Sequence, residues 1–158
     1  MIKIILAPSE VATCNLVGSL RSIIARGCSI HDAKIGEQDG VQADVMGFMA
    51  EYAFAKQFNV CVDLGFSPRS GSADGVLKGM RYDIKSTTYM SGKLLATLKV
   101  NPDVDIYVLS IVKPPIVMFP GWAYKKDLIK EENIKDLGHG KGYCLEQNQL
   151  TPFKVSDN

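Results

Sequence analysis

The sequence predicts a single α/β domain in which a central mixed β-sheet is flanked by helices. Three observations support this class. The chain has 158 residues, close to the roughly 150 residues of a typical domain. Apolar residues recur at helical spacing up to about residue 58, and short extended segments separated by Gly, Pro and Asn follow from about residue 60. We therefore expect one domain over 1–158, with a helical part at about 9–58 and a sheet-rich part at about 60–158.

The helical part is expected to contain two helices after a short opening strand. Ser9, which follows Pro8, should cap a first helix that ends near Gly27. Its helical spacing comes from Leu16, Leu20, Ile23 and Ile24. Polar residues 28–40 then predict a loop. A second helix is expected over 41–58, where Ala is frequent and the apolar stripe is Val45, Phe48, Met49, Tyr52, Ala53 and Ala55.

The sheet-rich part is expected to contain a series of short strands. Gly, Pro and Asn separate the extended segments 60–64, 75–77, 80–86, 93–100, 105–112 and 116–119. Residues 121–124 then lead into a short amphipathic helix at about 125–129, and a last strand is expected around 143–147. No internal repeat divides this region.

Composition and charge exclude several classes of protein. The longest apolar runs, such as 4–7 and 106–109, fall far short of the roughly 18 residues of a spanning helix, so no membrane partner is expected. The N-terminal segment does not resemble a secretory signal, and the expected compartment is the cytoplasm. The four cysteines, at 14, 28, 61 and 144, form no zinc pattern and are expected to be reduced. A net charge of +1 argues against wrapping long nucleic acid but allows a site for a few phosphates.

The residues that suggest chemistry lie between positions 71 and 87. If Lys78-Gly79 is a two-residue hairpin loop, counting outwards places Asp74 opposite Asp83. Two carboxylates about 5 Å apart repel each other unless a cation lies between them. The period of two along a strand also puts Lys85 on the face of Asp83. The spacing therefore predicts a cluster of two carboxylates and an ammonium group, although a three-residue loop would break this register.

An all-oxygen carboxylate site suits Mg²⁺ or Mn²⁺, and such ions serve phosphodiester hydrolysis. A nearby lysine, here Lys85, can stabilise charge that develops on the phosphate. A further acid is expected from the second helix, where Glu51 interrupts a face rich in Ala and aromatic residues. Asp44, two turns earlier on nearly the same face, is the alternative.

The order helix Glu, Asp, hairpin, Asp-x-Lys resembles the PD-(D/E)xK nuclease superfamily. Glu51, Asp74 and the triplet Asp83-Ile84-Lys85 match its motif positions, and the resemblance covers about 41–112. The segment 121–128, Gly-Trp-Ala-Tyr-Lys-Lys-Asp-Leu, is similar to the ends of small phage-type members. Ala73 stands where the family commonly has Pro.

The resemblance implies a restriction-endonuclease-like core and a metal-dependent nuclease. It implies that Asp74 and Asp83 bind the ion, that the Ile84 carbonyl assists and that Lys85 is the catalytic lysine. Glu51 would hold the metal or its water. For a phage-encoded member, the compartment would be the host cytoplasm.

Four further residues are candidates for substrate contacts. Arg69 and Ser70 precede Asp74 in a loop that could reach a backbone phosphate, with a plain turn as the alternative. Ser86 and Thr87 extend the strand beyond Lys85, and they are equally compatible with an ordinary strand role. The expected partner is nucleic acid, with DNA preferred. A homodimer is a further candidate, because cutting both strands of a duplex often requires two small subunits.

The sequence is also compatible with two other functions. The chain could be a nucleic-acid-binding or assembly module that keeps the fold without turnover. It could also be a metal-dependent phosphohydrolase that acts on nucleotides. Asp103 and Asp105 are expected only to cap or solvate a turn, and Trp122 to anchor the core.

Overall fold

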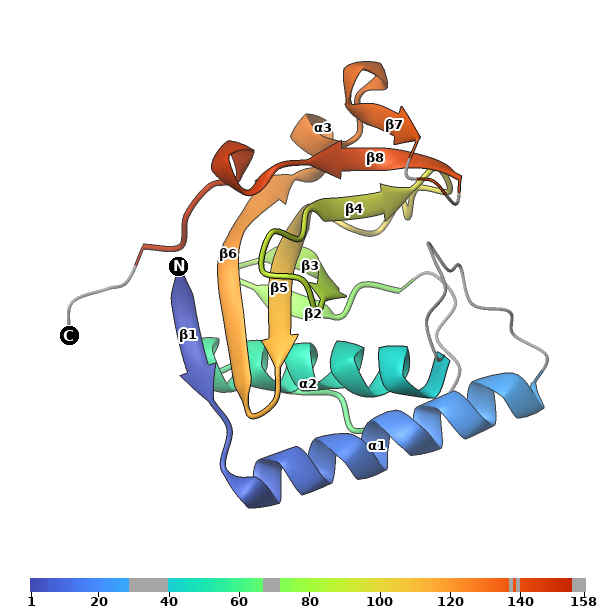
Figure 1. Cartoon of the computed structure of the whole chain (residues 1–158), viewed down its shortest axis with the longest axis vertical. Helices are drawn as coiled ribbons and strands as arrows, with labels where there is room; N and C mark the ends of the chain where they lie inside the picture. Colours follow the sequence, from blue (N-terminus) through green and yellow to red (C-terminus); the bar gives the residue numbers. More distant parts are fainter. Residues whose placement is uncertain (29–39, 67–71, 137, 139, 155–158) are drawn as a thin grey trace.

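The computed structural model describes residues 1–28, 40–66, 72–136, 138 and 140–154. Two long helices and eight strands dominate it (Figure 1). The elements in chain order are β1 (Ile2–Ile5), α1 (Pro8–Gly27), α2 (Gly40–Phe58), β2 (Gly75–Leu77), β3 (Met80–Thr87), β4 (Leu94–Thr97), β5 (Ile106–Lys113), β6 (Ile116–Tyr124), α3 (Lys125–Leu128), η1 (Glu131–Asn133), β7 (Ile134–Asp136), β8 (Lys141–Leu145) and η2 (Gln147–Gln149).

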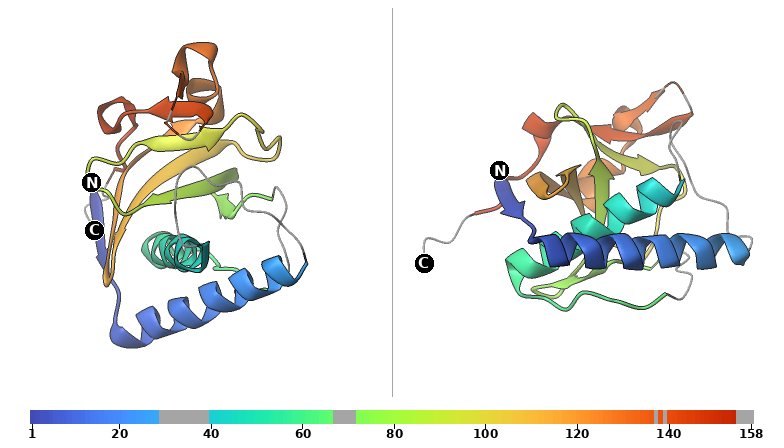
Figure 2. Two further views of the ribbon diagram at one scale, coloured as in Figure 1. Left: turned by 45° about the vertical axis from the view of Figure 1, so that its right-hand side comes forward. Right: turned by 60° about the horizontal axis from the view of Figure 1, so that its bottom comes forward.

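The strands form two sheets. The larger has the order β1-β6-β5-β3-β2, with β3 and β5 parallel and the other neighbours antiparallel, so it is a mixed sheet as predicted. The smaller, β4-β8-β7, covers its other face and was not foreseen. Helix α2 packs on β3, β5 and β6, and α1 packs on α2. Figure 2 shows α2 end-on between α1 and the larger sheet. The layers are therefore two helices, the mixed sheet and the small sheet.

Each layer boundary encloses apolar side chains. Between α2 and the larger sheet, Phe48, Phe54 and Phe119 are almost fully buried. Phe54 lies against Tyr82 of β3, with ring centroids 4.6 Å apart. Between the two sheets lies a second cluster that includes Tyr107 and Leu109 of β5. Because β5 is buried on both faces, it fixes the position of its neighbour β3, which carries the candidate site.

The start of α1 differs from the sequence prediction. Ala7, not Ser9, is the N-cap residue, and Pro8 begins the helix. Glu10 takes over the capping role, because its carboxylate accepts a hydrogen bond of 2.7 Å from the Ala7 N–H. The same carboxylate forms an ion pair of 2.8 Å with Lys56 of α2, which ties the two helices together.

The apolar stripe that predicted α1 is not its buried face. Leu16 and Ile23 are each 63% exposed, whereas the residues that face α2 are small: Cys14, Val17, Gly18 and Ser22. Small side chains let the two helix backbones approach closely. At Gly18, a Cβ atom would lie only 2.5 Å from the Val45 Cα.

We therefore expect Gly18→Ala to lower the free energy of unfolding by about 1–3 kcal/mol, because the new methyl group meets helix backbone that cannot move aside. Gly47→Ala on α2 is the matched control, since a Cβ there meets no atom within 4 Å. The control should be more stable than the wild type by up to about 1 kcal/mol. Urea unfolding of both variants checks this, and equal effects of the two substitutions would contradict the packing argument.

Candidate active site

The hairpin that carries the candidate site forms as the sequence predicts. Lys78 and Gly79 both have positive φ, 50° and 80°, as a two-residue type I′ turn requires. Leu77 pairs with Met80, and the ladder continues to Gly75 opposite Tyr82. The predicted register is therefore confirmed for residues 75–77 with 80–82. Asp74, expected opposite Asp83, lies just beyond the end of this ladder, and its N–H donates to the Tyr82 carbonyl.

Asp74 lies just before β2 and is bonded to β3 through both its backbone and its side chain. Its N–H donates to the Tyr82 carbonyl at 2.8 Å, and its Oδ2 accepts from the Ile84 N–H at 2.7 Å. The carboxyl group thus takes the place of a strand partner at the point where the β2 ladder ends. The hydrogen bond from the Ile84 N–H holds the Asp74 carboxyl group beside β3. Asp83 and Lys85 are the residues that precede and follow Ile84 along this strand.

Asp83 and Lys85 share one face of β3, as the period of two predicts. Lys85 Nζ lies 2.8 Å from Asp83 Oδ1, and the lysine side chain is 39% exposed. Tyr82 and Ile84 point the other way, into the core between α2 and the larger sheet. The ammonium group is therefore held at a carboxylate while remaining accessible from solvent.

Asp74 experiences a strongly unfavourable environment for negative charge. Burial, together with the charges of Glu51 and Asp83, raises the pKa of Asp74 to about 8, although the Ile84 N–H and Lys85 act in the opposite direction. Glu51, Asp83 and Lys85 therefore all lie near enough to Asp74 to affect its pKa. Glu51, not the alternative Asp44, is the helix acid that acts on Asp74. Asp44 instead lies 4.0 Å from Arg26.

Glu51 is held by Arg21 of α1, a residue that the sequence did not single out. Arg21 Nη1 donates to Glu51 Oε2 at 2.9 Å, and its other nitrogens donate to the Gly65 and Asp63 carbonyls. Its guanidinium carbon also lies 4.5 Å from the centre of the Phe48 ring. Arg21 thus joins α1, α2 and the segment that leads towards Asp74. The one sequence signal for a role of Arg21 is that it is a charged residue among the apolar residues of the first helix.

We expect Arg21→Met to lower the free energy of unfolding by about 1–3 kcal/mol, because it leaves the largely buried Glu51 carboxylate without this cation and removes two carbonyl contacts. Lys3→Met, which removes an exposed cation on β1 at the opposite edge of the larger sheet from β2, should change it by less than about 0.5 kcal/mol. Chemical denaturation of the two variants at pH 7 measures the difference. Equal stability of Arg21→Met and the wild type would show that the contacts contribute nothing.

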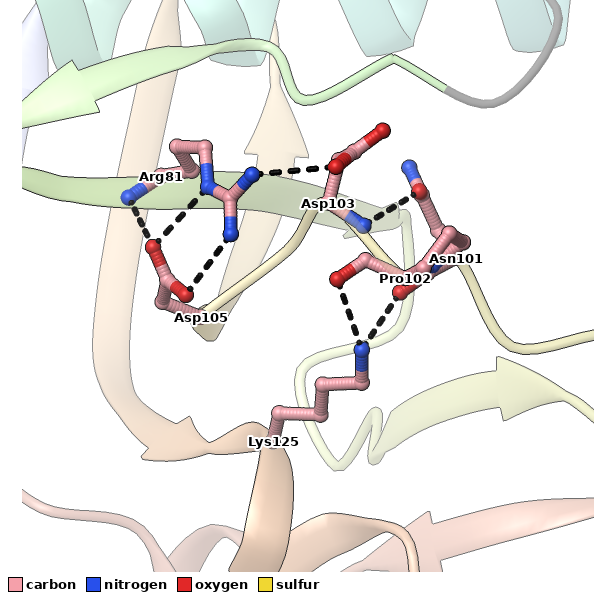
Figure 3. A network of polar contacts seen from close by, with 6 residues as sticks. All are labelled: Arg81, Asn101, Pro102, Asp103, Asp105 and Lys125. Atoms are coloured by element: carbon pink, nitrogen blue, oxygen red, sulfur yellow. Dashed lines mark hydrogen bonds and ion pairs between the residues drawn. The ribbon is translucent and has the colours of Figure 1, made fainter.

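A second polar network positions the start of β3 (Figure 3). Asp105 accepts from the Arg81 backbone N–H at 2.8 Å and from its guanidinium at 3.1 and 3.2 Å, while Asp103 accepts from Arg81 Nη1 at 3.0 Å. Lys125 donates to the carbonyls of Asn101 and Pro102. The expectation that Asp103 and Asp105 only cap or solvate a turn was wrong: they hold β3 two residues before Asp83.

The predicted substrate contacts have different outcomes. Arg69 and Ser70 lie outside the described residues. Ser86 and Thr87 end β3 and are partly exposed, and Thr87 Oγ1 accepts a hydrogen bond of 3.2 Å from the Tyr89 N–H. The Thr87 hydroxyl therefore has a structural role in the turn after β3. Trp122 is partly buried against the core, as expected.

The oxygen atoms of Glu51, Asp74 and Asp83 suit a hard cation, but Glu51 and Asp83 are already paired with cations. Within residues 1–28, 40–66, 72–136, 138 and 140–154, no group of three or more His, Cys, Asp or Glu side chains has the arrangement of a metal site. Glu51 instead pairs with Arg21 and Asp83 with Lys85. The three carboxyl groups supply the oxygen ligands that Mg²⁺ and Mn²⁺ prefer, and burial together with the charges of Glu51 and Asp83 raises the pKa of Asp74.

Comparisons with known proteins identify no relative. No protein-family model matches the chain, and no curated protein and no solved structure matches it either. None of the helices in the described part of the chain is long and apolar enough to cross a membrane.

Proposed function

We propose that this chain is a divalent-metal-dependent nuclease that hydrolyses phosphodiester bonds of nucleic acid, with DNA as the expected substrate and Mg²⁺ or Mn²⁺ as the ion. One observation carries the proposal. Glu51 of α2 and Asp83 of β3 both lie near enough to the buried Asp74, just before β2, to raise its pKa, and Lys85 lies 2.8 Å from Asp83, although up to 34 positions separate these residues. Three acids and one accessible lysine are the groups that hydrolysis of a phosphodiester needs.

The roles follow from the position of each group. Asp74, Asp83 and Glu51 would hold the ion together with the Ile84 carbonyl, and the ion when bound would activate water and polarise the phosphate. Asp74 would give up its proton as positive charge enters the site, because a nearby cation stabilises the carboxylate and so offsets the burial and the charges of Glu51 and Asp83 that raise its pKa. Lys85, oriented by Asp83, would stabilise the negative charge that develops on the phosphate.

The ion pairs of Glu51 with Arg21 and of Asp83 with Lys85 favour a second function, that of a module without turnover. Because Glu51 and Asp83 are each paired with a cation, the site as it stands is compensated without a metal. A protein with such a site could bind nucleic acid or take part in an assembly without turnover. This silent module is our second candidate, and it predicts binding that is independent of metal.

The experiment that tests the proposal is a cleavage assay on single-stranded and duplex DNA and RNA, with Mg²⁺, Mn²⁺ or EDTA. We expect cleavage of at least one DNA substrate in Mg²⁺ or Mn²⁺ and none in EDTA. Binding without cleavage of any polymer would favour the silent module. Hydrolysis of nucleotides alone, measured in parallel, would favour a phosphohydrolase and overturn the nuclease.

A further inference from the structure

We propose that the turn after β3 contacts the bases of the nucleic acid beside the cleaved bond, with Tyr89 stacking on a base. We call residues 88–92 the apolar turn. The inference rests on the proposed binding of nucleic acid and adds a residue that determines how the substrate is held. It concerns contact with bases, which the carboxylates and Lys85 do not supply.

The apolar turn exposes two large side chains next to each other. Tyr89 is 71% exposed and Met90 is 55% exposed. Single exposed apolar residues are common on protein surfaces. Two adjacent ones in the turn after β3 form a small exposed apolar patch. An aromatic ring with an exposed face is the side chain that stacks on nucleobases.

The backbone of the apolar turn is held in place. Gln147 Nε2, from η2, donates to the Met90 carbonyl at 2.7 Å and to the Gly92 carbonyl at 2.9 Å. Within the turn, the Gly92 N–H donates to the Tyr89 carbonyl at 2.9 Å. A Cβ at Gly92 would lie 2.3 Å from Thr87 Cγ2, so the close fit requires glycine there. A fixed backbone lowers the entropy that Tyr89 loses on binding.

The location connects the turn to the candidate site. Asp83, Lys85 and Thr87 share one face of β3, and the apolar turn begins directly after Thr87. Tyr89 follows Lys85 by four residues, so their Cα atoms are at most about 14 Å apart. Bases along one strand are about 3.4 Å apart. The Tyr89 Cα atom therefore lies within the length of about four stacked nucleotides of the Lys85 Cα atom.

The size of the exposed tip favours a base over a protein partner. A stable protein interface buries at least about 1,000 Å², far more than two side chains provide. A single base needs only one aromatic face and an apolar neighbour, and Tyr89 with Met90 supplies both. Stacking also needs no basic surface, which agrees with the net charge of +1.

The test compares Tyr89→Ala, Tyr89→Phe and Leu16→Ala with the wild type. Leu16 is an exposed apolar residue on α1, on the far side of α2 from β3, and serves as the control for loss of surface apolar area. Binding of fluorescently labelled single-stranded and duplex DNA and RNA is measured in Ca²⁺ and in EDTA. Cleavage of the same oligonucleotides and of a small chromogenic phosphodiester without bases is measured in Mn²⁺.

We expect Tyr89→Ala to weaken nucleic-acid binding by about 5- to 150-fold, the effect of losing one stacked base. Tyr89→Phe and Leu16→Ala should bind as the wild type does, and Tyr89→Ala should still hydrolyse the small phosphodiester. Wild-type affinity of Tyr89→Ala, or equal losses for Ala and Phe, would overturn the inference. Binding that depends on Tyr89 without any cleavage would support it and overturn the nuclease, while no binding by the wild type would overturn both.

Discussion

Replacing Lys85 by Ala is expected to reduce the rate of metal-dependent cleavage by at least about 100-fold, the usual effect of removing one group that stabilises charge in the transition state. Lys85 is accessible to a phosphate, and its ammonium group is oriented by Asp83 at 2.8 Å. The loss should fall on kcat more than on KM, because the group acts on charge that develops during the reaction. Single-turnover cleavage with saturating enzyme measures it.

Lys113→Ala is the matched control for Lys85→Ala. Lys113 is an exposed lysine at the end of β5, far along the sheet from Asp83, and its removal should leave the rate within about twofold. Lys113→Ala should melt close to the wild-type temperature, whereas Lys85→Ala leaves the Asp83 carboxylate, which is 15% exposed, without its cation and should melt lower. Cleavage is therefore compared well below both melting temperatures. If Lys85→Ala cleaves as fast as Lys113→Ala, Lys85 has no part in the reaction.

Asp74→Asn should abolish cleavage and yet stabilise the metal-free protein. The pKa of Asp74 is raised from 3.8 to about 8 in the folded state. Between those two values the unfolded chain gives up the proton and the folded chain keeps it, so the free energy of unfolding falls as pH rises. Below pH 4 both states carry the proton and this loss is absent. Asn has no charge to bury and its Oδ1 can still accept from the Ile84 N–H.

We therefore expect Asp74→Asn to exceed the wild type by about 1–3 kcal/mol at pH 8 and to match it near pH 4. Saturating Mn²⁺ should reverse the order at pH 8, because the ion stabilises only a protein that binds it. Denaturant unfolding at several pH values in EDTA and in Mn²⁺ measures both effects. A variant that is less stable than the wild type at pH 8 in EDTA would contradict the raised pKa.

Local patterns were enough to predict most of the elements. The hairpin 78–79 was predictable because a two-residue loop fixes the register of both strands. Residues 60–64 were expected to be a strand but have no ladder partner; Val60 and Val62 instead pack against the core. Strand β6 was expected to stop at Phe119 because Pro120 follows. It continues to Tyr124, since a register shift between Leu109 and Ile111 of β5 accommodates the proline.

Long-range contacts were not predictable from these patterns. The strand β7 has three residues and pairs only with β8, so its own sequence carries little signal. In the site, Asp74, Asp83 and Lys85 were predictable because one hairpin relates them. Arg21 was not, because its contact with Glu51 depends on how α1 packs against α2. The same holds for the contacts of Arg81 with Asp103 and Asp105, which lie more than twenty residues away in the sequence.

The most direct test of the central claim is the rate of DNA cleavage as a function of Mn²⁺ concentration, measured for the wild type and for Asp83→Asn. We expect no cleavage in EDTA and, for the wild type, a rate that rises with Mn²⁺ and saturates. Asp83→Asn should need far more Mn²⁺ or stay inactive, because it loses a carboxylate of the proposed ion site. Cleavage that persists in EDTA, or identical Mn²⁺ curves for the two proteins, would contradict it.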